Sequence, residues 1–139
     1  FKYAIGAIAA LGHDIFITLG VFSIFNFEIS LAVIAAFLTI VGYSLNDTVV
    51  VFDRIREFTK IHISWEKTKT VNGALNSTLS RTINTSLTTL VVLFAIFIFG
   101  GEAIRGFMFA LIVGVLVGTY SSLFIATPVM FDTSKNLKK

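Results

Sequence analysis

Hydrophobic residues gather into four long stretches along the chain, with short polar segments between them. The stretches cover about residues 3–25, 29–52, 82–99 and 107–129. A helix needs about 20 mainly apolar residues to cross the hydrocarbon core of a bilayer, and each stretch is close to that length. The pattern predicts an all-α membrane protein, a single domain over residues 1–139 with four spans, in which residues 53–80 form the long connection.

The long connection begins with an amphipathic segment. Its apolar positions recur at steps of three or four, and basic residues lie beside them; the apolar positions are Ile55, Phe58, Ile61 or His62, and Trp65. This spacing predicts a cytoplasmic helix in the membrane interface, with Trp65 at the depth of the lipid headgroups. A plain helical hairpin packed on the bundle is the alternative.

The composition supports lipid as the solvent. Hydrophobic residues make up 55% of the chain and charged residues only 14%, whereas soluble domains are roughly a quarter charged. The chain has no cysteine, which excludes a disulfide scaffold, thiol catalysis and a cysteine-ligated zinc site. Because no nucleophile–base set, phosphate-binding loop or metal-ligand spacing is visible, we expect no enzyme activity, no metal and no cofactor.

The distribution of charge predicts the orientation. The net charge is +3, and the basic residues lie at Lys2, in the long connection and in the tail at Lys135, Lys138 and Lys139. Cytoplasmic loops carry an excess of Lys and Arg. Both ends and the long connection are therefore expected on the cytoplasmic side, and the charge reflects membrane topology rather than nucleic-acid binding.

Three ionisable residues interrupt the apolar pattern: Asp14, Asp47 and Arg81. Each costs about 2.5–3.5 kcal/mol at the centre of a spanning helix, so such residues are functional candidates. Burial disfavours an ionised Asp47 and a nearby Arg81 favours it. An acid held between these effects can load and release a proton near neutral pH, and Arg81 would act purely electrostatically. A static buried ion pair is the alternative.

Further polar residues lie near these three. Asn46, Thr85 and Thr88 are candidates to hydrogen-bond around the Asp47–Arg81 pair, because they flank it at helical spacing. His13 and Asp14 form an additional polar site in the first span, with a role in helix packing as the alternative.

Several motifs resemble a known family. The sequence GYSLNDTVVVFDRIRE at residues 42–57 closely resembles the SecF protein-export membrane subunits of the SecD/SecF family, within the resistance–nodulation–division superfamily. The resemblance continues in LSRTINTS at 79–86, FGG at 99–101 and ALGHD at 10–14. It implies half of a transporter core of that superfamily. The four spans would be the third to sixth of that half, in a chain that is a fragment or a processed product.

The resemblance also implies a function. SecF works with SecD beside the Sec translocon in the bacterial inner membrane, where the proton-motive force helps to move exported preproteins outward. The intramembrane acid and arginine of the family fall on Asp47 and Arg81, and the SecD half or subunit would add an acidic partner. The coupling ion would be a proton, or sodium in some members. The rival functions are a small-molecule efflux pump of the same superfamily and a translocon scaffold without ion coupling.

Overall fold

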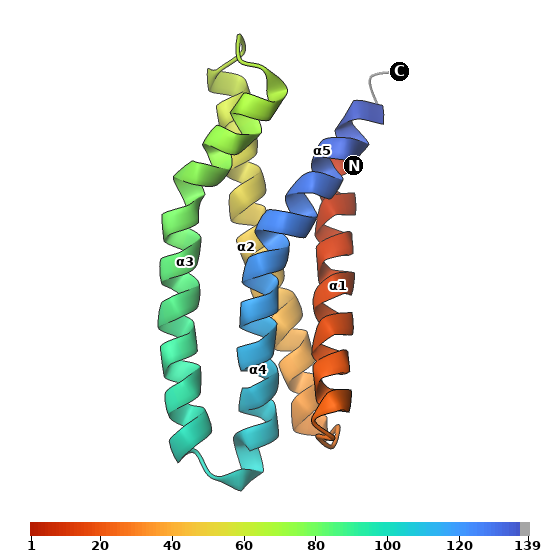
Figure 1. Ribbon diagram of the computed structural model, residues 1–139, viewed down its shortest axis with the longest axis vertical. Coiled ribbons are helices and arrows are strands. Elements are labelled where there is room, and N and C mark those ends of the chain that lie inside the picture. The colour runs from red at the N-terminus through yellow and green to blue at the C-terminus, as the bar shows by residue number, and fades with distance from the viewer. Residues whose placement is uncertain (137–139) are drawn as a thin grey trace.

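The computed structural model describes residues 1–136, and the side chains of residues 1–134, as an antiparallel helix bundle (Figure 1). Three long helices are continuous: α1 (Lys2–Ile24), α2 (Leu31–Ile61) and α3 (Lys67–Phe99). The fourth consists of α4 (Glu102–Ser121), the π-helix η1 (Ser122–Ala126) and α5 (Thr127–Asn136). All four are long and apolar enough to cross a membrane. The expected all-α membrane bundle is confirmed, and no strand occurs among the described residues.

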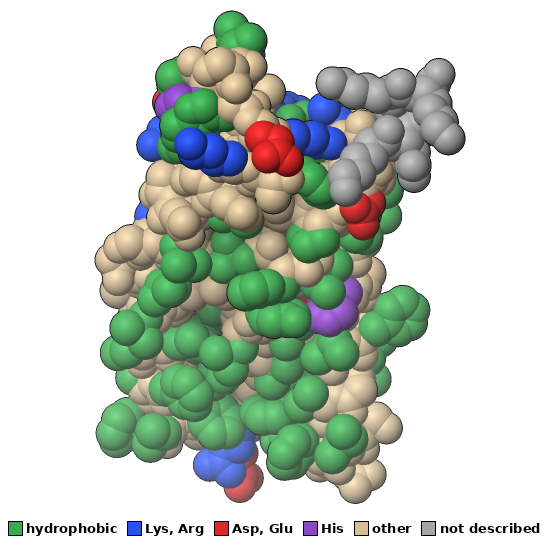
Figure 2. All heavy atoms as spheres, turned by 45° about the horizontal axis from the view of Figure 1, so that its top comes forward, with side chains coloured by type: hydrophobic (Ala, Val, Ile, Leu, Met, Phe, Trp, Pro, Cys, Tyr) green, Lys and Arg blue, Asp and Glu red, His purple; other side chains and the backbone are tan. Residues whose placement is uncertain are grey.

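The two ends of the bundle differ in charge. Both chain ends and the turn between α2 and α3 lie at one end, and the other two turns lie at the opposite end (Figure 1). Lys and Arg side chains gather at the first end (Figure 2), and Arg56 and Lys69 there lie over the rings of Tyr3 and Trp65. The tail residues Lys135, Lys138 and Lys139 lie outside the described side chains. Basic side chains are therefore concentrated at one membrane surface.

The long connection is not a separate element. Residues 53–61 are the last turns of α2, residues 67–80 are the first turns of α3, and only residues 62–66 form a turn. The predicted interfacial helix is thus wrong, and the helical hairpin is observed. The reason is that its apolar stripe continues the stripe of the span: Ile55 packs with Val51 and Val71 in one buried cluster. The rings of His62 and Trp65 stack with their centroids 3.8 Å apart at the turn.

Two apolar clusters form the core, one toward each end. The cluster near the short turns contains Phe22, Ile40 and Leu93. The cluster near the chain ends contains Phe52 and Met130, among other residues. Most of the buried polar residues lie between these two clusters along each helix, whereas Thr70, Thr127 and Ser134 lie within or beyond the second cluster. The bundle therefore has an apolar–polar–apolar core, and the polar layer is near its middle.

Small residues let the helices approach closely. A Cβ atom on Gly114 of α4 would overlap the Ile40 side chain of α2, and a Cβ on Gly6 of α1 would lie 2.6 Å from the Ala126 carbonyl oxygen. Neither contact is compatible with a side chain unless a neighbour moves. Glycine at these positions allows the close backbone contacts by which helices pack in membranes.

We predict that Gly114→Ala destabilises the bundle by about 1–3 kcal/mol, because it overpacks the contact with the buried Ile40. Gly20→Ala is the matched control, since nothing lies within 4 Å of its added Cβ. Unfolding of the full-length protein in detergent micelles, followed by circular dichroism, measures both. Equal midpoints for the two variants would contradict the close α2–α4 contact.

Candidate functional site

The polar layer draws side chains from all four long helices. Its buried members share small size and oxygen-bearing groups. They are Asp14 and Thr18 on α1; Ser44, Asp47 and Thr48 on α2; Thr78, Thr82 and Ser86 on α3; and Ser121 and Ser122 on the fourth helix. Buried polar groups are costly unless they are hydrogen-bonded. The partners of each group therefore show what the layer can do.

Asp47 is buried without a full set of partners. The residue is 7% exposed, and its Oδ2 atom has no hydrogen-bond partner in the described structure. The Thr82 hydroxyl is likewise buried and unpartnered. Arg81 acts on the Asp47 carboxyl by Coulombic attraction. No ion pair joins these two residues, because the ion pairs among the described side chains are His13–Asp14, Arg54–Glu57 and Arg56–Asp53.

Arg81 itself is exposed in this chain. It lines a hollow of about 360 Å³ between α2 and α3, together with Asp53, Arg54, Glu57, Ser77 and other residues. Arg54 is already engaged there, since its guanidinium donates to Glu57 at 2.7 Å and to Ser77 at 2.9 Å. Arg81 thus lies on the exposed side of α3, one residue before the buried Thr82, and it makes no hydrogen bond or ion pair with Asp47 among the described residues.

The other predicted neighbours lie on the outer surface. Asn46, Thr85 and Thr88 are exposed, and the structure does not bring them to Asp47. The hydroxyls of Thr85 and Thr88 donate to backbone carbonyls of α3 itself. The buried face of α3 carries Thr78, Thr82 and Ser86 instead. A spacing of four residues places these hydroxyls on one face, but Arg81 and Thr85 share the exposed face at the same spacing, so the sequence does not show which face is buried.

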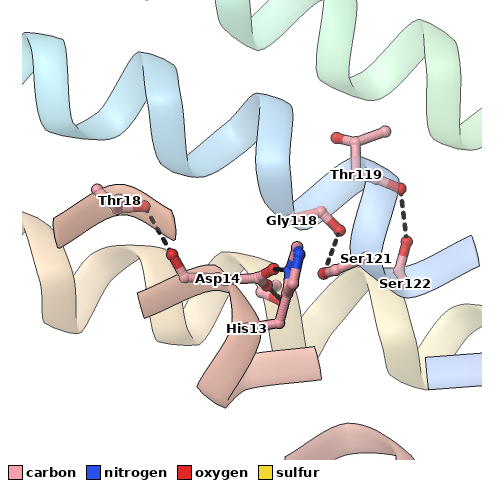
Figure 3. A network of polar contacts seen from close by, with 8 residues as sticks. His13, Asp14, Thr18, Gly118, Thr119, Ser121 and Ser122 are labelled. Atoms are coloured by element: carbon pink, nitrogen blue, oxygen red, sulfur yellow. Dashed lines mark hydrogen bonds and ion pairs between the residues drawn. The ribbon is translucent and has the colours of Figure 1, made fainter. Parts of the chain in front are cut away.

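Asp14 contrasts with Asp47 because both of its carboxylate oxygens have partners. Asp14 is fully buried on α1; the Ser44 hydroxyl donates to its Oδ2 at 2.5 Å, and the His13 Nδ1 atom lies 3.2 Å from its Oδ1. Figure 3 shows His13 and Asp14 facing the Gly118 turn of α4. A Cβ on Gly118 would lie 3.7 Å from the carboxylate. The structure therefore brings His13 and Asp14 together, as predicted, in the same layer as Asp47.

The π-helix lies beside Asp14. Ser121 and Ser122 donate to the carbonyls of Gly118 and Thr119 (Figure 3). Thr127 donates to the Ser122 carbonyl at 3.2 Å. Pro128 has no backbone N–H, so it cannot continue the regular helical hydrogen bonding. The hydroxyls supply hydrogen bonds within this irregular turn. Single π-turns inside α-helices are frequent at functional sites.

A second hydroxyl cluster links three helices. The hydroxyls of Ser86 on α3 and Thr119 on α4 lie 2.6 Å apart, and the Tyr43 hydroxyl of α2 donates to Ser86 at 3.4 Å. The sequence pattern did not predict this cluster, because its three members lie on three different helices. Groups of this kind can hold water and pass protons along hydrogen bonds.

The chemistry that this layer allows is protonation of a carboxylate. The described residues contain no group of three or more potential metal ligands. A buried carboxylate oxygen without a partner is a place where a proton can bind, and the charge of Arg81 favours its release. Whether a proton is bound then decides the charge at the centre of the bundle.

Comparison with known proteins places this architecture in a family. The model of the family described as protein export membrane protein SecD/SecF, C-terminal, matches residues 1–136. The curated SecF protein translocase subunits of Rhodothermus marinus and Petrotoga mobilis are 57% and 50% identical to this chain, over 95% and 100% of its length. The alignments cover 45% and 46% of those relatives. The chain thus spans about half the length of the curated relatives that it matches.

Solved structures give the same result. The crystal structure of SecDF in its super-membrane-facing form matches with a TM-score of 0.93 and 42% identity, over 99% of this chain and 19% of that one. A structure of the translocon-associated SecDF from Thermus thermophilus matches with a TM-score of 0.91, also at 42% identity, over 96% of this chain and 19% of that one. The family resemblance drawn from the motifs is confirmed.

We predict that one isosteric change has different effects on the two buried acids. Asp14→Asn should lower the free energy of unfolding by about 1–3 kcal/mol, because it disrupts a carboxylate with a partner on each oxygen. Asp47→Asn should leave stability unchanged or raise it by about 1 kcal/mol, because it removes a buried, incompletely paired charge. Unfolding in detergent micelles measures both, and equal losses would contradict the difference in pairing.

Proposed function

The chain belongs to the SecD/SecF C-terminal family of protein-export membrane proteins, and we propose that it is the ion-coupled part of an accessory subunit of the Sec translocon. In this role, the proton-motive force across the bacterial inner membrane drives conformational change that promotes export of preproteins. The observation that carries the proposal is Asp47, a buried carboxylate with one unpartnered oxygen in the middle of a membrane bundle. Perturbed acids of this kind cluster at functional sites.

The proposed cycle begins with a proton that binds the free Oδ2 atom of Asp47. Protonation removes the negative charge, and with it the attraction between Asp47 on α2 and Arg81 on α3. The two helices then repack, and release of the proton restores the attraction. Asn46, Thr85 and Thr88 remain candidates to order water on the outer side of this pair.

The exposed polar face indicates a membrane partner. Arg81, Asn46, Thr85 and Thr88 are exposed on helices that are long and apolar enough to span the bilayer. Lipid cannot solvate such groups, so they must face protein or water. The matched SecDF chains contain much more polypeptide than this chain covers. We propose that the SecD half or subunit covers this face and supplies an acidic partner to Arg81.

The orientation follows from the distribution of basic residues. Basic residues flank the helix ends at the end of the bundle where α1 begins, α5 ends and α2 turns into α3. They are Lys2, Arg54, Arg56, Lys60 and Lys67. Because cytoplasmic loops carry an excess of Lys and Arg, we propose that this end of the bundle faces the cytoplasm. A change in helix packing at the polar layer would then be transmitted toward the outer side of the membrane. The parts of α1, α2, α3 and α4 that form the apolar cluster with Phe22, Ile40 and Leu93 would transmit it.

The central prediction is that Asp47→Asn in the full-length protein abolishes the gradient-dependent part of export. The amide keeps the shape of the side chain but cannot exchange a proton, so this part should fall by roughly tenfold or more. Transport of a secreted reporter into membrane vesicles, with and without an imposed proton gradient, measures it. Asp132→Asn is the matched control, because Asp132 is an exposed acid outside the polar layer.

The rival functions predict other results. If the protein is a scaffold without ion coupling, the Asp47→Asn variant will support export at the full rate, and that result would contradict the proposal. An efflux pump predicts that the variant loses export of small molecules while the secreted reporter is unaffected. Assembly of the complex must be checked in each case, because lost assembly would also lower export.

The role of Arg81 is tested separately by its charge. We predict that Arg81→Gln loses most of the gradient-dependent export, whereas Arg81→Lys retains a measurable part of it. The reason is that Arg81 acts on Asp47 at a distance and makes no hydrogen bond to it. Equal loss in both variants would show that the guanidinium shape, and not the charge, matters. The same vesicle assay provides the comparison.

A further inference from the structure

Asp14 is a buried acid that the proposed cycle does not use. Its contact with Ser44 joins α1 to α2 through side chains. Among the described residues, this is the one side-chain hydrogen bond between α1 and any other helix, because the remaining interhelical ones join α2, α3, α4 and α5 to each other. The other α1 contacts are less directional: apolar and small side chains, the Arg56 guanidinium over the Tyr3 ring, and the His13 ring beside Tyr120.

This contact lies next to the proposed proton site. Ser44 and Asp47 are three residues apart on α2, so they share one face of the helix and are separated by about one turn. Both are buried. Ser44 points to α1 and the Gly118 turn of α4, while Asp47 is acted on by Arg81 of α3. A rotation of α2 that breaks the Ser44–Asp14 bond would therefore also turn Asp47 relative to Arg81.

The surroundings of Asp14 favour an anchoring role over proton loading. The groups that titrate near it are His13 on its own helix, Tyr120 of α4 beside the His13 ring, and Asp47 one turn beyond Ser44 on α2. Residues 107–131 of the fourth helix contain no charged residue. Both of the Asp14 oxygens are partnered, unlike those of Asp47.

From this geometry we infer that the Asp14–Ser44 hydrogen bond is a positioning contact for the proton site: it sets the rotation of α2 and so the placement of Asp47 against Arg81. His13 covers the outer side of the anchor, with its side chain 29% exposed. The inference rests on the proposed function, since it assumes that Asp47 exchanges protons. It adds α1 to the helices whose packing controls that exchange.

Ser44→Ala is the direct test, because it removes the hydrogen bond and leaves every titratable side chain in place. Ser121→Ala is the matched control: the same change at an equally buried position, whose hydroxyl donates only to the Gly118 carbonyl of its own helix. The full-length protein in membrane vesicles is treated with a hydrophobic carbodiimide, which modifies protonated carboxyls. Labelling of Asp47 is then measured by mass spectrometry between about pH 5 and 9.

The expected result is a shift of the Asp47 labelling midpoint by at least about half a pH unit in Ser44→Ala, with Ser121→Ala close to the unmodified protein. A loss of folding or assembly alone would lower labelling or export without moving the midpoint. An unchanged midpoint in Ser44→Ala overturns the inference, even if export falls. Equal shifts in the two serine variants overturn it too, because the effect would then belong to the whole layer.

The same measurement separates this inference from the function on which it rests. If Asp47 in the unmodified protein shows no pH-dependent labelling, the result contradicts both the proposed proton site and the proposed positioning contact. If labelling of Asp47 depends on pH and its midpoint is unchanged in Ser44→Ala, the result contradicts only the positioning contact.

Discussion

The high cost of a charge in an apolar medium is the constraint on which this structure depends. A carboxylate buried in a bundle of apolar helices is stable only with partners, and the two acids of the polar layer meet this constraint differently. Asp14 is held by Ser44 and His13, whereas Asp47 has a free oxygen and a cation that acts from a distance. The difference in pairing gives one acid a structural role and leaves the other able to exchange a proton.

The remaining architecture keeps the polar layer isolated. Phenylalanine-rich packing on one side includes Phe22 and Phe109, whose ring centroids lie 5.7 Å apart. The second cluster closes the side toward the chain ends, where Phe52 and Met130 are buried. Gly6 and Gly114 allow the helix backbones to approach closely, so that the side chains of these clusters pack tightly. In the proposed cycle, a proton would reach the middle of the bundle through the buried hydroxyls and the hollow beside Arg81.

Periodicity predicted much of the fold, because a spanning helix is set by local apolar length. The four helices, the concentration of basic residues at one end of the bundle and the two buried acids all follow from the sequence. The extent of α2 and α3 did not, since the amphipathic segment after residue 52 has the composition of an interfacial helix. It is a hairpin because Ile55 and Val71 share a buried cluster, which is a tertiary contact.

The details of the site were harder to predict. Thr85 and Thr88 carry the right groups but lie on the outer face of α3, whereas Thr82 and Ser86 face inward. A helix shows which residues share a face, but not which face meets its neighbour. The π-helix was not predicted either, because the phase shift that one extra residue causes is hard to detect in a span that is apolar on nearly every side. The bond from Ser44 to Asp14 spans 30 residues and needs the bundle to be assembled.

The measurement that tests the central claim most directly is infrared difference spectroscopy of the full-length protein in lipid as the pH is changed. The account predicts a carboxylic-acid C=O band that appears and disappears with pH near neutrality. This band should be absent in Asp47→Asn and present in Asp132→Asn. A spectrum that is the same with and without the Asp47 carboxyl would contradict the account, because the bundle would then have no proton to exchange at its centre.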